Sequence, residues 1–151
     1  MRYDFKISDG AKYVLDSLHN SGYEAYIVGG SVRDMYLSAT AHDFDITTSA
    51  TPEETKKIFS DKTVIETGIK HGTVTVVLDR TPFEITTYRT EIGYADSRHP
   101  DSVSFVNNVT EDLARRDFTM NAIAYSPYDG IVDPFCGYRD IQNKIIRTVG
   151  D

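Results

Sequence analysis

Residues 29–34 read GGSVRD and residues 43–45 read DFD, and these two stretches decide the fold. The glycine pair lets the backbone approach a polyanion closely, because no Cβ stands in the way. Arg33 adds a permanent positive charge in a planar fork that suits phosphate oxygens. Asp43 and Asp45 are two residues apart on an extended segment, so their carboxylates share one face of a strand. A phosphate-binding turn beside paired carboxylates predicts metal-assisted chemistry on a nucleoside triphosphate.

The segments around these stretches alternate between helical and strand patterns. Helices are expected from apolar spacing over 11–18, from the capping box T-P-E-E that opens 51–59, and over 31–37, 110–114 and from about 138. Strands are expected over 24–28, 43–47, 72–78, 83–88 and 103–106, with a hairpin at 79–82. The polar residues 89–100 are typical of a long mobile loop. This alternation predicts the α/β (or α+β) class, with a mixed sheet flanked by helices.

Composition limits the class of protein. The chain has 151 residues, of which 40% are hydrophobic, enough for one domain with a core. Its net charge of -7 argues against a free-standing nucleic-acid binder, although Arg115 and Arg116 form a candidate basic patch. The single Cys136 excludes a disulfide framework and a cysteine-rich zinc site. No apolar run suits a membrane span or a signal peptide, so a cytoplasmic location is expected.

Two clusters carry the predicted chemistry, and each has a simpler alternative. Asp43 and Asp45 are candidate metal ligands, whereas a bare Asp-x-Asp is usually a solvated strand edge. Glu84, mid-strand in an apolar and β-branched run, is the candidate third carboxylate, or else an outward-facing glutamate. If Asp117 opens a helix, Asn121 lies on the same face one turn later, and the two side chains can hold ribose hydroxyls.

The neighbouring arginines of this second cluster would then grip triphosphate oxygens. The alternative is helix capping by Asp117 beside a solvated arginine pair. His71, in a turn, is either a phosphate contact or an ordinary turn residue, and Arg89, Asp96 and Arg98 either close over a substrate or are solvated. Neither a P-loop nor a G-x-G-x-x-G fingerprint is present, which argues against P-loop ATPases and dinucleotide oxidoreductases.

Taken together, the motifs resemble the N-terminal catalytic head of the class II tRNA nucleotidyltransferases, the CCA-adding enzymes, and of the related bacterial poly(A) polymerases. The matching segments are VGGSVRD at 28–34, DFDI at 43–46, FEITTYR at 83–89, RRDFTMNA at 115–122, DPF at 133–135, DI at 140–141 and KIIR at 144–147. The resemblance extends from about residue 26 to the end of the chain. One departure is Cys136 before Gly137, where the family usually has a glycine pair, and only a local effect is expected from it.

This resemblance implies a polymerase-β-like nucleotidyltransferase fold, with Mg²⁺ held by Asp43 and Asp45 and Glu84 as a further catalytic carboxylate. The implied nucleotide-binding residues are Gly29, Gly30, Ser31, Arg33, Asp34, Arg116, Asp117 and Asn121. Gly30, Arg33 and Arg116 would bind phosphates, and Asp117 and Asn121 would face the ribose. The loop at 89–100 matches a flexible loop that helps the family's enzymes switch nucleotide.

The implied activity is template-independent addition of CMP and AMP from CTP and ATP to the 3′ end of tRNA, with pyrophosphate release by a two-metal mechanism. Poly(A) addition, or a specialist for A or C, has the same head motifs. An alternative of another class is a nucleotide- and metal-binding module without turnover. The family's base-selecting Glu-Asp-x-x-Arg motif and its helical neck, body and tail domains, which hold most of the tRNA, do not lie within residues 1–151. We therefore expect one head domain from a longer chain.

Overall fold

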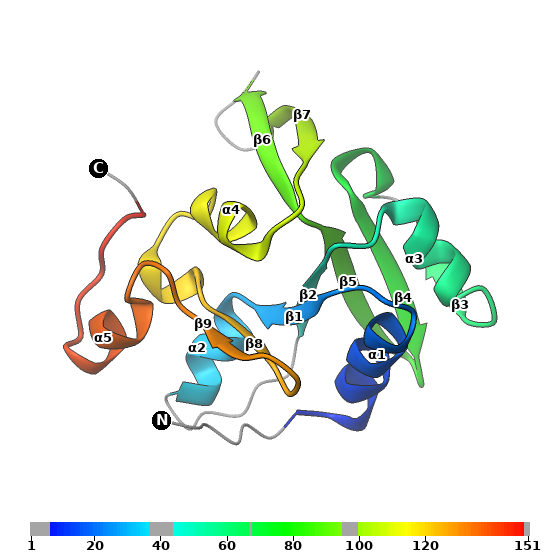
Figure 1. The fold of residues 1–151 in the computed structure, drawn as a ribbon, viewed down its shortest axis with the longest axis horizontal. Helices are drawn as coiled ribbons and strands as arrows, with labels where there is room; N and C mark the ends of the chain where they lie inside the picture. Colours follow the sequence, from blue (N-terminus) through cyan, green and yellow to red (C-terminus); the bar gives the residue numbers. More distant parts are fainter. Residues whose placement is uncertain (1–6, 37–43, 67, 95–99, 150–151) are drawn as a thin grey trace.

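A seven-stranded mixed sheet forms the centre of the molecule, in the strand order β3-β4-β5-β2-β1-β8-β9 (Figure 1). It is seen in a computed structural model that describes residues 7–36, 44–66, 68–94 and 100–149. The strands are β1 (Ala25–Val28), β2 (Asp45–Thr48), β3 (Thr63–Ile65), β4 (Thr73–Leu78), β5 (Thr81–Thr87), β8 (Ala124–Ser126) and β9 (Gly130–Val132). β2 and β5 run parallel, and the other neighbouring pairs run antiparallel.

The helices are short apart from the first. They are α1 (Asp9–Asn20), α2 (Gly30–Tyr36), α3 (Pro52–Ile58), α4 (Val109–Ala114) and α5 (Gly137–Gln142), with 3₁₀ turns η1 (Ile69–His71) and η2 (Thr119–Asn121). α1 is capped at its N-terminus by Ser8, whose side chain accepts a hydrogen bond from the Ala11 backbone N–H at 3.1 Å. α3 begins with the predicted capping box of Thr51 and Glu54. Within the described ranges, no helix has the length and apolarity needed to cross a membrane.

Alternate residues of β1 supply two hydrophobic cores, one on each face of the sheet. Ala25 and Ile27 belong to the larger core, which also holds buried residues of α1 and α2 and Phe59, the residue that follows α3. Tyr26 and Val28 belong to the smaller core, together with the inward face of α4. A strand whose four residues are all buried is therefore fixed on both faces, and it ends at the glycine turn.

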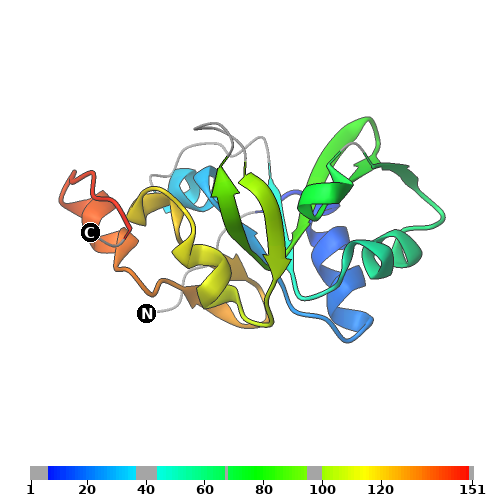
Figure 2. The ribbon, with the colours of Figure 1, turned by 90° about the horizontal axis from the view of Figure 1, so that it is seen from above.

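A two-stranded antiparallel ribbon of β6 (Arg89–Tyr94) and β7 (Pro100–Phe105) stands away from the main sheet at the top of Figure 1 and lies in front of the centre of the molecule in Figure 2. The prediction of a long loop over 89–100 is therefore wrong for residues 89–94, which pair with residues 100–105. Charged residues of both signs hide the strand pattern there. Asp96 and Arg98 lie outside the described residues, so the expectation for their side chains is untested.

Other boundaries of helices and strands differ from the predicted ones, because local backbone geometry overrides the sequence pattern. The hairpin is confirmed, but its turn is only Asp79 and Arg80, both at positive φ (48° and 68°). β5 accordingly begins at Thr81, which pairs with Leu78. The short strand β3 has no counterpart among the predicted elements. Asp117 does not open an α-helix, since only the 3₁₀ turn η2 follows it.

Candidate nucleotide-binding site

The glycine turn connects the buried strand β1 to helix α2. Gly29 has φ +76°, a left-handed conformation that glycine adopts without a Cβ penalty. Its carbonyl accepts the backbone N–H groups of Val32 at 3.1 Å and Arg33 at 3.3 Å, which closes the first turn of α2. A Cβ added at Gly30 would lie 3.2 Å from Arg33 Nη2. A side chain at Gly30 would therefore displace the Arg33 guanidinium by a few tenths of an ångström.

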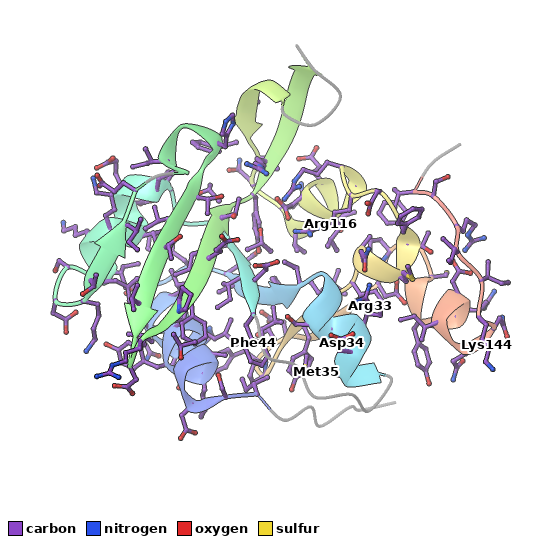
Figure 3. All side chains as sticks on the ribbon, turned by 180° about the vertical axis from the view of Figure 1, so that it is seen from behind. Arg33, Asp34, Met35, Phe44, Arg116 and Lys144 are labelled. Carbon is purple, nitrogen blue, oxygen red and sulfur yellow. The ribbon has the colours of Figure 1, made fainter. Side chains whose placement is uncertain are left out.

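A pocket of about 410 Å³ opens beside this turn. It is lined by Gly29, Gly30, Arg33, Asp45, Arg115, Arg116, Asp117 and Asn121. These residues come from three separate parts of the sequence, namely the β1–α2 turn, the start of β2 and the segment after α4. Figure 3 shows Arg33 on α2 and Arg116 on that last segment. Three guanidinium groups around one pocket favour a polyanionic ligand.

A second pocket, of about 450 Å³, lies between the start of α1, the α3–β3 connection and the β4–β5 turn. Its charged lining residues are Asp9, Asp61, Asp79 and Lys62. The excess of carboxylates makes it unsuitable for a triphosphate. The arginine-lined pocket is therefore the candidate site.

Arg33 is oriented by two neighbours. Its Nη1 donates to Asn121 Oδ1 at 3.2 Å, and its Nε and Nη2 both lie 3.4 Å from Asp34 Oδ1. Asp34 is half-exposed, so this ion pair contributes little to stability. The bond to Asn121 matters more for geometry because it joins α2 to η2 across the pocket.

Arg116 is more deeply buried, with 17% of its side chain exposed. Burial lowers the pKa of its guanidinium, the neighbouring Arg115 lowers it further, and Asp112 and Asp45 act in the opposite direction. Its Nε is buried and has no hydrogen-bond partner among the described residues. A desolvated cation with an unused donor is well prepared to bind an anionic oxygen.

The carboxylates of the expected metal site are only partly described. Asp45 lines the pocket, and its Cα partner on the parallel strand β5 is Glu84, so the two side chains share a face of the sheet. Glu84 itself does not line the pocket. Asp43 lies outside the described residues, and within them no group of three or more potential metal-ligating side chains occurs. Neighbouring carboxylates on one face have the oxygen chemistry that Mg²⁺ prefers.

Asp117 and Asn121 both line the pocket, although no α-helix places them there. Asp117 Oδ1 accepts the Phe118 backbone N–H at 2.8 Å, and η2 then turns the chain so that Asn121 reaches Arg33. Ser31, buried in the first turn of α2, does not line the pocket, and neither does Asp34. His71 lies near the ribbon, where its carbonyl accepts a hydrogen bond from Arg89.

Sequence reasoning missed Asp112, a fully buried carboxylate on α4 that pairs with Arg115 and Arg116, two of the three arginines of the pocket. The sequence does contain a pattern that predicts this buried carboxylate. Val109 and Leu113 mark the inward face of the helix, and position 112 lies on that same face. A carboxylate there, three and four residues before an arginine pair, indicates a buried charge partner.

Residues 25–147 match the family described as the poly A polymerase head domain, and the chain belongs to this family. The CCA-adding enzyme of Lactobacillus helveticus (strain DPC 4571) is 57% identical over 138 residues, which are 91% of this chain and 34% of that relative. The chain therefore spans about a third of the length of such relatives. The predictions of family and fold class are confirmed.

Solved structures agree with this assignment. The Bacillus stearothermophilus CCA-adding enzyme in complex with CTP is 47% identical, with a TM-score of 0.81, and the match covers 93% of this chain and 33% of that one. A tRNA nucleotidyltransferase complexed with a primer tRNA and an incoming ATP analog is 29% identical, with a TM-score of 0.69, over 91% of this chain and 39% of that one. The chain thus has the fold of the corresponding third of these proteins.

Proposed function

We propose that this chain is the nucleotide-binding catalytic head of a template-independent RNA nucleotidyltransferase. It would add CMP and AMP from CTP and ATP to the 3′ end of tRNA and release pyrophosphate. The observation that carries the proposal is the pocket at the glycine turn, where three arginines meet the carboxylate of Asp45. The similarity to a CCA-adding enzyme in complex with CTP supports the choice of ligand.

The triphosphate is proposed to lie between the glycine turn and the arginines. Arg33 and Arg116 bind its oxygens, and the glycine turn leaves room for close approach. Asp117 and Asn121 line the same pocket and face the ribose hydroxyls. Asn121 has a second function here, because its side-chain oxygen already holds Arg33 in position.

Asp43 and Asp45 are proposed to hold Mg²⁺, assisted by Glu84. The oxygen donors of Asp45 and Glu84 on one face of the sheet fit this metal. When bound, the metal ions supply activation of the attacking hydroxyl and charge stabilisation of the leaving pyrophosphate. The 3′-hydroxyl oxygen of the RNA then bonds to the α-phosphorus while the bond to pyrophosphate breaks. The arginines fix the triphosphate for this in-line displacement.

A direct test uses the chain with Mg²⁺, labelled CTP or ATP, and tRNA that lacks its terminal CCA. Incorporation of label supports the enzyme, and the length of the product distinguishes CCA addition from poly(A) addition. Calorimetric binding of CTP without incorporation instead favours a binding module. This second candidate is retained because the chain spans only a third of its relatives. Absence of both incorporation and binding would overturn the proposal.

A further inference from the structure

We propose that Asp112 is a positioning residue that holds Arg116 in its triphosphate-binding orientation. The inference rests on the proposed function, because it assigns a cause to the geometry of the same pocket. Asp112 does not line the pocket and is fully buried on α4, so it acts through the arginine and not on the nucleotide.

Each carboxylate oxygen of Asp112 has one neutral and one cationic neighbour. Oδ1 accepts the Arg89 backbone N–H at 3.0 Å and lies 3.5 Å from Arg115 Nε. Oδ2 accepts the Thr47 hydroxyl at 3.0 Å and lies 3.6 Å from Arg116 Nη2. The neutral bonds come from β2 and from the base of the β6–β7 ribbon. The carboxylate is therefore anchored to the sheet independently of the arginines.

The guanidinium of Arg116 reaches from this anchor to the glycine turn. Its Nη2 pairs with Asp112, whereas its Nη1 would lie 3.6 Å from a Cβ added at Gly29. One end of the planar fork is thus fixed behind the pocket, and the other end is held where a phosphate oxygen approaches. Fixing the fork before the ligand arrives reduces the entropy lost on binding.

The charge of Asp112 also favours the pocket-facing orientation of Arg116. Arg115 and Arg116 are adjacent and largely buried, and Arg115 lowers the pKa of Arg116. The negative charge of Asp112 opposes this repulsion at the short range where screening is weak. Without that charge, Arg116 would turn toward solvent and lose its contact with the glycine turn.

The test is calorimetric titration of CTP with Mg²⁺ into the chain and its variants. Asp112→Asn keeps the size of the side chain and an oxygen acceptor but removes the charge, and we expect CTP to bind about tenfold more weakly. Glu111→Gln is the matched control, because it removes one charge from the same helix at an exposed position, and its affinity should be unchanged. Melting curves establish that both variants are folded.

Variants that lack one arginine distinguish a positioning role of Asp112 from a general structural role. In Arg116→Ala, the further change Asp112→Asn should cost no additional affinity, whereas in Arg33→Ala it should again cost about tenfold. Equal losses in both backgrounds, or unchanged or tighter binding by the single variant, would overturn the inference and leave the proposed function standing. Failure of the unaltered chain to bind CTP would instead overturn the proposed function, and the inference with it.

A second variant serves if Asp112→Asn does not fold. Thr47→Val removes one anchor of the carboxylate and keeps its charge. We expect a loss of CTP affinity of about threefold that disappears in the Arg116→Ala background. Unchanged affinity in the folded Thr47→Val variant would count against the inference.

Discussion

The glycine turn allows a left-handed backbone and leaves space beside Arg116, and comparison of alanine substitutions at two glycines can separate these two effects. Gly29 and Gly130 have almost the same backbone angle, φ +76° and +77°, but only Gly29 lies at the pocket. Alanine at either position adds a left-handed penalty of about 1 kcal/mol. An added Cβ at Gly29 would lie 3.6 Å from Arg116 Nη1, whereas one at Gly130 meets nothing within 4 Å.

We therefore predict that Gly29→Ala and Gly130→Ala lower the free energy of unfolding equally, by about 1 kcal/mol. Only Gly29→Ala should weaken CTP binding, by about fivefold, because its methyl group occupies the approach to Arg116. Urea unfolding and calorimetry measure the two effects. Equal CTP affinity in the two variants would mean that the turn is needed for the fold alone.

The carboxylate of Asp45 gives a second prediction at this scale. It is exposed at the start of β2, so Asp45→Ala should leave the melting temperature nearly unchanged. Nucleotide addition with Mg²⁺ should fall by about a thousandfold if Asp45 is a metal ligand. Asp61→Ala, at an exposed position in the α3–β3 connection, is the control. Near-normal incorporation by the Asp45 variant would remove it from the catalytic residues.

At the scale of elements, the start of α5 places two neighbouring residues in contrasting environments: Gly137 has no room for a side chain, whereas the side chain of Cys136 is exposed on a left-handed backbone. Gly137 is buried, and a Cβ there would lie 2.0 Å from the Thr119 carbonyl oxygen, an impossible approach. Cys136, where the resemblance implied glycine, is exposed and has φ 59°. The side chain of Asp133 accepts the backbone N–H groups of Gly137 at 2.7 Å and Tyr138 at 3.0 Å, which fixes this start.

Opposite effects on stability follow for the two positions. Gly137→Ala should lower the free energy of unfolding by about 3 kcal/mol, since backbone must move. Cys136→Gly should raise the melting temperature by about 2 °C, because removal of the left-handed penalty exceeds the added entropy of the unfolded chain. Cys136→Ala, which keeps a Cβ, should change little. Calorimetric melting tests all three, and a stabilised Gly137→Ala would contradict the packing seen around η2.

The elements that the sequence predicted correctly are those whose patterns lie within a few neighbouring residues. The capping box at Thr51 and the apolar spacing of α1 are read from a few neighbouring residues. The β6–β7 ribbon depends instead on cross-strand pairs such as Thr90 with Ser104, which no short window contains. The sequence pattern predicts Asn121 at the site from its spacing to Asp117. It does not predict the 3₁₀ turn or the bond to Arg33, because that bond joins residues far apart in the sequence. The parallel register that sets Glu84 beside Asp45 also needed the sheet.

For the whole molecule, net charge conceals local charge. The chain carries -7 overall, yet three arginines surround one pocket, and carboxylates dominate the pocket at the other end of the sheet. A whole-chain charge is therefore a poor guide to a ligand that binds within a few ångströms of particular side chains. The acidic balance argues only against broad contact between this chain and RNA.

Two buried tyrosines make the stability of the whole fold sensitive to alkali. Burial raises the pKa of Tyr26 to about 12, helped by Asp129 and Glu24, and burial beside Glu24 raises the pKa of Tyr88 further. In the unfolded chain both titrate near their ordinary value of 10. Above that pH the unfolded state loses protons that the folded state keeps, so stability falls as pH rises.

We predict that the free energy of unfolding, constant near pH 9, falls between pH 10 and pH 12 by about 1.4 kcal/mol per pH unit for each tyrosine. Tyr26→Phe should remove one of the two contributions, because phenylalanine keeps the ring in the core but has no proton to lose. Tyr13→Phe, at a tyrosine that is 42% exposed, is the matched control for the loss of a tyrosine hydroxyl. Urea unfolding at a series of pH values measures the slopes. An equal slope for Tyr26→Phe and the unaltered chain would mean that the Tyr26 hydroxyl ionises as readily in the folded protein as in water.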